Sequence, residues 1–584
     1  MLRSRSARIS AGAIFVLSFL LLLLVVAPSF AQSSGESKHT IVRVYYPDVA
    51  TGKRILISFE ASVLETNQSG GYHVLDANDT AIARLLAAGL RVEEDPFYVP
   101  QFVRLHDFPC YTTVEETFAS AAAIELANPN LADWIDIGDS WEKIEGLGGY
   151  DLMALVLTNE TIAGDKPRLL LTCAIHAREY TTAQLCLDFA HYLVDGYGTD
   201  ADATWILNDH EVHIVLQANP DGRKQAEIGQ FWRKNTNQDY CGPASSSRGA
   251  DLNRNFPFAW NCCGGSSGLG CDPTYRGISP ASEPEVSSLV DYGRMIFLDQ
   301  RGPGASDAAP ADASGLFFDV HSYGELILWP YGFTASPAPN GIAMQSLGRK
   351  LAFGNNYWPE QAIGLYPTDG TTDDFFYGEL GVASIAFELG TEFFQACSVY
   401  ENTVKPANLP VLIYGAKVAR TPYLTPSGPD VTGLSLSPST VAGGQDVALS
   451  FSVDDSRFSS ANGLEPSQVI AAAEYYIDVP PWSGGLAVAL PPSDGSFNSV
   501  AEAVAGQIET VGLSAGQHLV FARGQDASGQ WGAMSAAFLM VEDPAMVPSL
   551  SEEARWVAAF LLVLAGSLFF QSRDRVRADR YGAS

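Results

Sequence analysis

Positively charged residues are scarce in this chain. Its 584 residues include 35 Lys and Arg against 66 Asp and Glu, so the formal net charge at pH 7 is −31. A surface of this sign repels phosphate groups, which excludes nucleic acid and anionic membrane surfaces as main partners. It suits basic substrates, although many acidic proteins carry such a charge only for solubility.

Charged residues of either sign are also few. They make up 17% of the chain, whereas hydrophobic residues make up 47%. This composition excludes a disordered chain and predicts globular domains, of which the length allows roughly three to four. The acidic residues form no calcium-loop motif, so the sequence specifies no calcium site.

Both ends of the chain carry apolar segments with positively charged flanks. Near the N-terminus, three arginines precede an apolar run over 11–28 and the small residues Ser29 and Ala31. This order is typical of a secretory signal peptide, which we expect over residues 1–31. Export then places the bulk of the chain outside the cytoplasm, either secreted or at the cell surface.

The C-terminal segment, residues 547–584, has a similar three-part order. Its uncharged stretch from Trp556 to Ser572 has 17 residues, fewer than the about 20 that a membrane helix needs. Four arginines follow this stretch and are expected to stay on the cytoplasmic side. The segment therefore predicts either a sorting signal that tethers the protein transiently to the membrane or an ordinary C-terminal membrane anchor.

Three globular regions lie between these ends. Residues 39–108 combine strand-like segments at 39–47 and 54–61 with a helix-like segment at 80–90, which predicts a small α/β unit. Residues 111–420 alternate strand-like and helix-like segments. This alternation predicts a mostly parallel sheet with helices on both faces.

Helix signals disappear after about Leu424. Short strand-like segments separated by turns continue over residues 426–543. This pattern predicts one β-sandwich domain, in which no binding motif is evident.

Three residues at the ends of apolar runs form a candidate metal site. His176 and Glu179 are spaced His-x-x-Glu directly after the run 169–175, and His321 follows Glu179 by 142 positions at the end of a second run. Two histidines and one carboxylate are typical of a catalytic zinc ion, because three protein ligands leave one coordination position open for water. One buried histidine alone would indicate no such site.

A second pair of histidines does not predict a metal site. His210 and His213 lie three residues apart in a strand-like segment, so their side chains point to opposite faces. They also lack the His-Glu-x-x-His spacing of helical zinc sites.

Residues 111–420 resemble the zinc metallocarboxypeptidases of the pancreatic A/B type, in particular their secreted bacterial members. The resemblance rests on nine segments in family order: IGDSWE, AIHAREY, NPDGR, FWRK, DLNRNF, CDPTYRG, DVHSY, LYPTDGTTDDF and AFEL. It implies a mixed eight-stranded sheet with helices on both faces and one Zn²⁺ held by His176, Glu179 and His321. It also implies that residues 39–108 are a propeptide, with a plain accessory domain as the alternative.

The resemblance assigns three further residues to the chemistry. Glu388, after the apolar run 382–387, matches the general base that takes a proton from the attacking zinc-bound water; a salt-bridging glutamate is the alternative. Arg233 matches the arginine that stabilises the oxyanion. Asp251 matches the carboxylate that orients the first zinc histidine through its second ring nitrogen.

Five other residues match substrate-binding positions. Asn253 and Arg254 match the pair that binds the free C-terminal carboxylate of the substrate, which an internal peptide bond lacks. Tyr366 matches a mobile tyrosine that closes over the substrate, and Arg178 matches an arginine for the upstream part of the peptide. Asp373 follows Tyr366 by seven positions, where the family places the floor of its specificity pocket.

An acid at position 373 predicts a preference for C-terminal Lys or Arg, or a broad specificity. The alternative is that Asp373 and Asp374 form a solvated pair in a loop. The expected partners are peptide or protein C-termini, and the expected state is a monomer.

Two other functions stay open from the sequence. One is an amidase or peptidase that acts on cell-wall peptides with the same zinc site. The other is a surface binding protein whose peptidase domain is inert, although the intact Glu388, Arg233 and metal-ligand set argue against it.

Eight cysteines, an even number, allow disulfides in an exported protein. Cys241 and Cys271 match a family disulfide. A bond between Cys110 and Cys397 is one of the alternatives that the sequence leaves open.

Four cysteines remain. Cys262 and Cys263 are adjacent and have no evident partner. Cys173 and Cys186 flank the candidate metal motif in strand-like and helix-like segments, so we expect them to be buried thiols.

Overall fold

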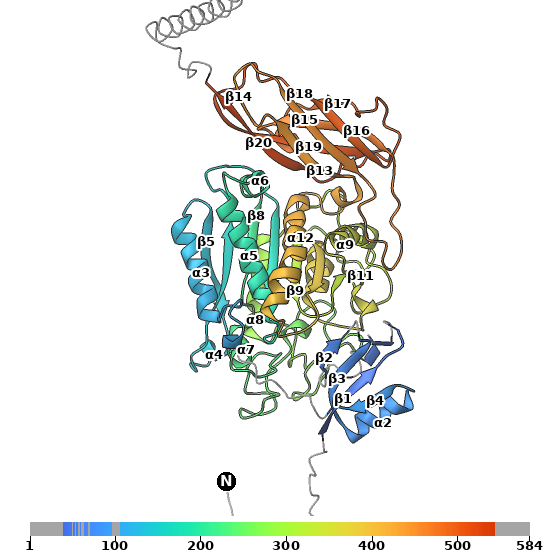
Figure 1. Cartoon of the computed structure of the whole chain (residues 1–584). Coiled ribbons are helices and arrows are strands. Elements are labelled where there is room, and N and C mark those ends of the chain that lie inside the picture. Colours follow the sequence, from blue (N-terminus) through green and yellow to red (C-terminus); the bar gives the residue numbers. More distant parts are fainter. Residues whose placement is uncertain are drawn as a thin grey trace, which may run out of the picture.

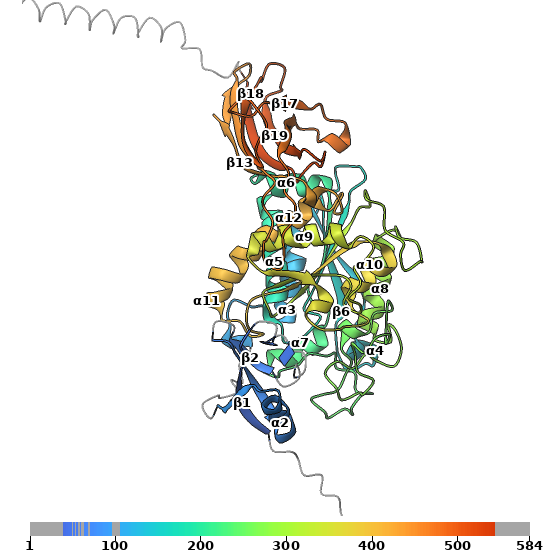
Figure 2. The ribbon, with the colours of Figure 1, turned by 90° about the vertical axis from the view of Figure 1, so that its right-hand side faces the viewer.

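The structure is a computed structural model. It describes residues 105–543 and, in the N-terminal region, residues 39–95 apart from short gaps at 49–50, 53, 56–58, 60–62 and 68–69. Three units follow one another along the chain, with the two smaller ones at opposite ends of the large central one (Figures 1 and 2). The expected signal peptide and C-terminal tail lie outside the described residues. Within the described part, no helix is both long and apolar enough to cross a membrane.

The N-terminal unit is built on a four-stranded antiparallel sheet. Its strand order is β2-β3-β1-β4, and helix α2 packs on it. A small core of its own contains Val44, Leu75 and Leu85. The elements are β1 (His39–Tyr45), β2 (Val63–Asn67), β3 (Tyr72–Asn78), α2 (Asp79–Ala87) and β4 (Arg91–Glu94).

The strand expected over residues 54–61 is wrong at the positions that the structure describes. Residues 54, 55 and 59 are helical. Ile55 and Phe59 are four residues apart, so a helix turns both side chains toward the same core. Short apolar segments do not distinguish a strand from a helix by pattern alone.

The central unit contains the expected mixed sheet of eight strands. The strand order is β11-β10-β12-β9-β7-β8-β6-β5. Strands β8, β7, β9 and β12 are parallel to one another, and β11 is parallel to β10. The pairs β10–β12, β6–β8 and β5–β6 are antiparallel. The strands are β5 (Ala132–Asp139), β6 (Asp151–Leu157), β7 (Arg168–Cys173), β8 (Glu211–Val215), β9 (Leu316–His321), β10 (Leu326–Trp329), β11 (Trp358–Gln361) and β12 (Ala383–Glu388).

Helices cover both faces of this sheet, as expected. In β7, Leu169 and Leu171 belong to one hydrophobic core, whereas Leu170 belongs to the core on the opposite face. The first core includes residues of α3 (Val114–Ala127), α5 (Tyr180–Gly196), α6 (Ala201–Asp209), α9 (Gly341–Asn355) and α12 (Lys405–Val418). The second includes residues of α8 (Pro284–Ile296) and α10 (Thr372–Leu380). Shorter helices are α4 (Trp141–Ile144), α7 (Pro220–Glu227) and α11 (Cys397–Val399).

The parallel strands bring three distant sequence segments to one edge of the sheet. The carboxyl ends of β7, β9 and β12 meet there, and His321 at the end of β9 is in register with Glu388 at the end of β12. In open α/β sheets, ligands bind at this edge.

The C-terminal unit consists of two packed β-sheets, which fits the expected β-sandwich. The sheet orders are β13-β15-β18 and β14-β20-β19-β16-β17. Alternate residues of β15, such as Val447, Leu449 and Phe451, point into the core between them. The strands are β13 (Asp430–Ser437), β14 (Thr440–Ala442), β15 (Val447–Asp454), β16 (Ile470–Ile477), β17 (Val488–Leu490), β18 (Ala501–Ile508), β19 (Gly516–Asp526) and β20 (Ser535–Glu542).

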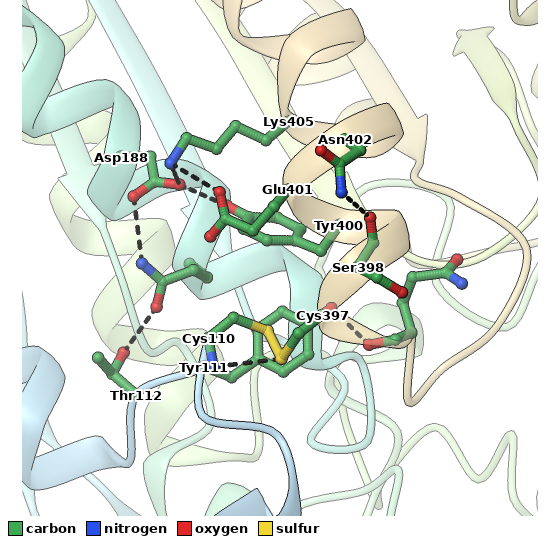
Figure 3. Close-up of a disulfide and its surroundings, with 12 residues drawn as sticks. Cys110, Tyr111, Thr112, Asp188, Cys397, Ser398, Tyr400, Glu401, Asn402 and Lys405 are labelled. Carbon is green, nitrogen blue, oxygen red and sulfur yellow. Dashed lines mark hydrogen bonds and ion pairs between the residues drawn. A yellow bond between two sulfur atoms is a disulfide. The ribbon is translucent and has the colours of Figure 1, made fainter.

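All the cysteines are paired in disulfides. The expected Cys241–Cys271 bond is present. Cys110 is bonded to Cys397, which ties the start of the central unit to the segment that follows β12. Figure 3 shows this bond close to Tyr400, whose hydroxyl group donates a hydrogen bond of 2.7 Å to Asp188.

The expectation that Cys173 and Cys186 are thiols is wrong. Both are buried, but they form a disulfide, with their Cα atoms 6.8 Å apart. The chain turns back after β7, so the beginning of α5 lies against the end of the strand. The adjacent Cys262 and Cys263 are bonded to each other.

Candidate active site

The three candidate metal ligands come from two strand ends. His176 and Glu179 lie in the turn between β7 and α5, and His321 is the last residue of β9. The turn begins at Ala174, whose φ of 57° is rare for a residue with a side chain. All three ligand side chains are buried.

The ligand atoms converge on one point. Nδ1 of His176 lies 2.8 Å from Oε1 of Glu179 and 3.1 Å from Nδ1 of His321. Nδ1 of His321 lies 3.2 Å from Oε2 of Glu179. Two neutral imidazole lone pairs and a carboxylate facing one another repel unless a cation lies among them. The donor set therefore fits a zinc ion.

Buried carboxylates orient both histidines. Nε2 of His176 lies 3.2 Å from Asp251, and Nε2 of His321 lies 2.7 Å from Asp319. Each Nε2–H donates to its carboxylate, so each Nδ1 presents a lone pair to the metal position. Burial alone would raise the pKa of Asp251, but Arg233, Arg254 and His176 together hold it well below its usual range.

Asp319 was not predicted from the sequence. It precedes His321 by two residues in β9, so both side chains project from the same face of the sheet. An acid two residues before a candidate ligand histidine, inside an apolar run, was the signal that could have identified it.

A cavity beside the metal position is lined by nine of the eleven residues that the resemblance assigns to the site: His176, Glu179, Arg233, Asn253, Arg254, His321, Tyr366, Asp373 and Glu388. The sequence analysis missed several other lining residues, among them Tyr323, Leu328, Ala386 and Phe393. The cavity thus has a charged end at the metal and an apolar wall from β10 and β12.

Besides Asp251, Arg178 is the predicted site residue that does not line this cavity. Its guanidinium group lies 4.1 Å from the ring centre of Phe393 and 4.7 Å from that of Phe231. Because Phe393 lines the cavity, Arg178 supports its wall.

Arg233 is held in place by Asp251. Its Nε and Nη2 atoms donate hydrogen bonds of 3.1 and 2.9 Å to Oδ2 of this carboxylate. The same aspartate therefore orients a metal ligand through Oδ1 and an arginine through Oδ2.

Asn253 and Arg254 lie side by side in the short helix η3 (Leu252–Arg254). Oδ1 of Asn253 accepts a 2.8 Å hydrogen bond from the backbone N–H of Thr372. Arg254 donates a hydrogen bond of 2.7 Å to the carbonyl group of Asn253 and one of 3.2 Å to the hydroxyl group of Tyr366. The arginine and the tyrosine therefore meet at the edge of the cavity.

Asp373 and Asp374 are not a solvated pair. Both are buried in the first turn of α10. Asp373 lines the cavity, and burial raises its pKa. Asp374 lies deeper and accepts a 3.0 Å hydrogen bond from the backbone N–H of Gly332.

His210 and His213 lie outside the cavity, as expected. His213 pairs with the hydroxyl group of Tyr292 at 2.6 Å, and His210 packs against Trp205. The expectation that both lie in one strand is wrong, because His210 ends helix α6 and only His213 lies in β8.

Comparisons with known proteins agree with this geometry. Residues 118–406 match the family model described as zinc carboxypeptidase, Peptidase M14. The zinc carboxypeptidase of Saccharothrix mutabilis subsp. capreolus is 32% identical over 52% of this chain and 71% of its own length. The chain belongs to the M14 zinc carboxypeptidases. Carboxypeptidase A1 of Rattus norvegicus is 26% identical over 60% of this chain and 76% of its own length.

Solved structures of zinc carboxypeptidases share the fold. Carboxypeptidase A from Helicoverpa armigera aligns with a TM-score of 0.53 at 21% identity, over 65% of this chain and 97% of its own length. As a member of the M14 zinc carboxypeptidases, the chain is a metallocarboxypeptidase, a hydrolase of peptides with free C-termini. Its cofactor is Zn²⁺, for which His176, Glu179 and His321 supply the ligand set.

Among the described residues of the N-terminal unit, Val63 reaches the active site of this zinc carboxypeptidase. Val63, the first residue of β2, is buried and lines the cavity together with the metal ligands and Arg254. The sequence contained no signal for this contact.

Proposed function

We propose that this enzyme removes the C-terminal residue of peptides by attack of an activated water, with a basic or broad specificity. The observation that carries the proposal is the cavity in which His176, Glu179, His321, Arg254, Asp373 and Glu388 meet. In this cavity, the metal ligands and Glu388 lie beside an arginine that can bind a free carboxylate and an aspartate that can bind a basic side chain.

A bound zinc ion would supply Lewis acidity, which activates water and polarises the scissile carbonyl group. Glu388 lies half-buried in the cavity at the end of β12, in register with His321. In our proposal its carboxylate takes a proton from the attacking water and passes it to the leaving amine.

In our proposal, Arg233 and Arg254 each stabilise a different negative charge of the substrate. We assign Arg233, fixed by Asp251, to the charge that develops on the carbonyl oxygen. We assign Arg254, with Asn253 and Tyr366, to the terminal carboxylate of the substrate. The carboxylate requirement makes the enzyme an exopeptidase.

Asp373 supports the specificity proposal. Its buried carboxylate lies in a cavity whose walls include Leu328, Ala362 and Ala386. The aliphatic stem of Lys or Arg fits such walls while its charge meets Asp373. Apolar side chains also fit them, which explains why a broad specificity is part of the proposal.

The N-terminal unit, residues 39–108, is in our proposal a propeptide that limits access to the site. Val63 in the cavity supports this role. We further propose that the chain is exported as a monomer through the segment 1–31. The segment 547–584 would then be a sorting signal or membrane anchor.

The proposal is tested with zinc-loaded protein, before and after limited proteolysis, and matched peptides ending in Arg, Lys, Phe, Leu or an amide. We expect release of the last residue only from free C-termini. Glu388→Gln should lower kcat about 10²–10⁴-fold, the usual contribution of a general base. The control is Glu379→Gln, which changes a carboxylate paired with Arg294 on the surface.

Each outcome of this assay bears on one part of the proposal. Faster release of Arg and Lys than of Phe and Leu supports Asp373 as the floor of the pocket. A preference for Phe and Leu contradicts that role. Absence of release from every peptide, with one zinc bound, contradicts the carboxypeptidase proposal and favours cell-wall peptides as substrates.

A further inference from the structure

The adjacent disulfide Cys262–Cys263 lies in a loop that packs against the active site. We call residues 262–266 the disulfide loop. Asp369, which is 1% exposed, accepts hydrogen bonds from the backbone N–H groups of Cys263 at 3.2 Å and Gly265 at 3.0 Å. It also accepts one from the hydroxyl group of Ser266. Three donors of one loop therefore converge on one buried carboxylate.

The opposite side of the disulfide loop holds the substrate-binding arginine. The carbonyl group of Gly265 accepts a 3.1 Å hydrogen bond from Nε of Arg254. Gly265 thus donates to Asp369 and accepts from Arg254, and it links the two side chains through a single residue. A Cβ atom at this position would lie 2.3 Å from the carbonyl carbon of Thr368, so only glycine allows this close approach.

Tyr366 closes a ring of contacts. Arg254 donates to its hydroxyl group at 3.2 Å, and Tyr366 and Asp369 belong to the same short segment before α10. Hydrogen bonds connect Arg254 to Gly265 and Gly265 to Asp369. The backbone then connects Asp369 to Tyr366, which is hydrogen-bonded to Arg254. Movement of the disulfide loop therefore shifts both groups that we assign to the terminal carboxylate of the substrate.

We propose that Asp369 is a positioning residue, which uses the disulfide loop to hold Arg254 and Tyr366 at the substrate carboxylate. The inference rests on the proposed function of Arg254. The adjacent disulfide restrains the backbone that presents the N–H groups of Cys263 and Gly265 to Asp369. Asp369 itself does not line the cavity, so it acts through the two residues that do.

The test compares Asp369→Asn with Asp272→Asn in the otherwise unchanged chain, treated as in the preceding assay. Asn removes the charge and places an amide N–H₂ among three donors. Asp272 accepts a hydrogen bond from Ser267 in the neighbouring turn and is not part of the ring of contacts. We expect Asp369→Asn to raise KM for free-acid peptides about 10–100-fold, as loss of a supporting hydrogen-bond partner does, with kcat changed less than about threefold. Asp272→Asn should leave both constants near those of the parent.

A second readout separates positioning from general damage to the fold. Binding of the dipeptide Gly-Arg should weaken in Asp369→Asn, whereas binding of acetohydroxamate, which binds zinc and has no carboxylate, should not change. Equal weakening of both ligands, or an unchanged KM in folded protein with one zinc, would overturn the proposal. If Asp369→Asn does not fold, Ser266→Ala removes one of the three donors, and its KM should still rise about threefold.

The double variant Cys262→Ser/Cys263→Ser tests the contribution of the disulfide. We expect a smaller rise in KM, about three- to tenfold, because the hydrogen bonds to Asp369 remain. If the parent releases no residue from any peptide, the proposed function fails. The Gly-Arg comparison between the parent and Asp369→Asn then still decides whether Asp369 positions Arg254.

Discussion

The two accessory units are attached to the catalytic domain in different ways. Four residues of the β-sandwich, Tyr476, Phe521, Ala533 and Met534, belong to the same hydrophobic core as Trp205 of α6. The N-terminal unit, at the opposite end of the molecule, has a separate core and contributes Val63 to the active-site cavity (Figure 1). The sandwich therefore shares the core of the catalytic domain, whereas the separate core of the N-terminal unit supports our proposal that this unit is a removable propeptide.

Polar contacts also attach the sandwich firmly to the catalytic domain. Arg349 of α9 is buried and donates hydrogen bonds of 2.6–3.1 Å to the carbonyl groups of Ser459, Ala461, Asn462 and Gly463. It also forms a 3.4 Å ion pair with Glu465. Buried charges of this kind are stable only while all their partners stay in place, so separating the sandwich would leave them unmatched.

Ending the chain at residue 425 should have the largest effect. The truncation exposes Trp205 and removes its buried partners Tyr476, Phe521 and Met534. The expected loss in the free energy of unfolding is about 4–9 kcal/mol, comparable to the whole stability of a typical domain. We expect aggregated or unfolded protein by circular dichroism and soluble yield. Removal of residues 1–104 is the matched control and should leave a folded domain. A chain ending at 425 that melts at the parent temperature would contradict the comparison.

Arg349→Met should have the next largest effect. Breaking a buried pair from one side costs about 3–5 kcal/mol, because Glu465 is left without its charged partner. Arg457→Met is the control, since Arg457 pairs with Asp430 at 3.2 Å but its side chain is 34% exposed. Such a pair is worth about 1 kcal/mol or less. Urea unfolding measures the free energy of unfolding of both variants. Equal decreases would show that the contact between α9 and the sandwich stabilises the protein no more than an exposed ion pair does.

Cleavage between residues 95 and 105 should change activity more than stability. If Val63 blocks the cavity, only the fraction of molecules with the unit displaced can bind substrate. We expect kcat/KM to rise at least about tenfold on cleavage. Val63→Ala should give part of this rise in the uncut chain, because it removes apolar surface from the buried contact. A fall in activity on cleavage would assign the N-terminal unit to substrate binding instead.

Asp455→Asn should give the smallest change in stability, and the size of this change depends on pH. Burial raises the pKa of Asp455, near the sandwich junction, to about 6. The folded protein therefore binds a proton more tightly than the unfolded chain, and stability falls as pH rises through this range. Asn avoids this loss, so the variant should be more stable than the parent at pH 8 and equally stable near pH 4. Thermal melts across this pH range check the prediction, with Asp494→Asn, a substitution on an exposed loop, as the control.

The strands of the central sheet were predictable because burial on both faces leaves continuous apolar runs in the sequence. The metal ligands were predictable because each follows such a run, and the roles of Arg233, Arg254 and Glu388 came from the family resemblance. The segment 54–61 was misread at the positions that the structure describes, because a short apolar pattern does not distinguish a strand from a helix. Asp319 was missed because one acid inside a strand has no meaning until its neighbours are placed.

Other features depend on contacts that no local pattern records. The pairing of Cys173 with Cys186 follows from how α5 folds back on β7, and the contact of Val63 with the cavity follows from how two units dock. The hydrogen bonds of Asp369 likewise join segments that are more than 100 residues apart.

The order of residues along the chain already specifies the chemistry of this protein: which residues can bind zinc, which carry charge, and which segments must be buried. Residue type and local periodicity are enough for that, because they act within a few residues of one another. The tertiary structure decided which of these groups meet, including the convergence of His176 and His321, the ring of contacts around Asp369, and the different attachment of the two accessory units. Such contacts depend on the packing of distant segments, whose geometry is set only when the whole chain is folded.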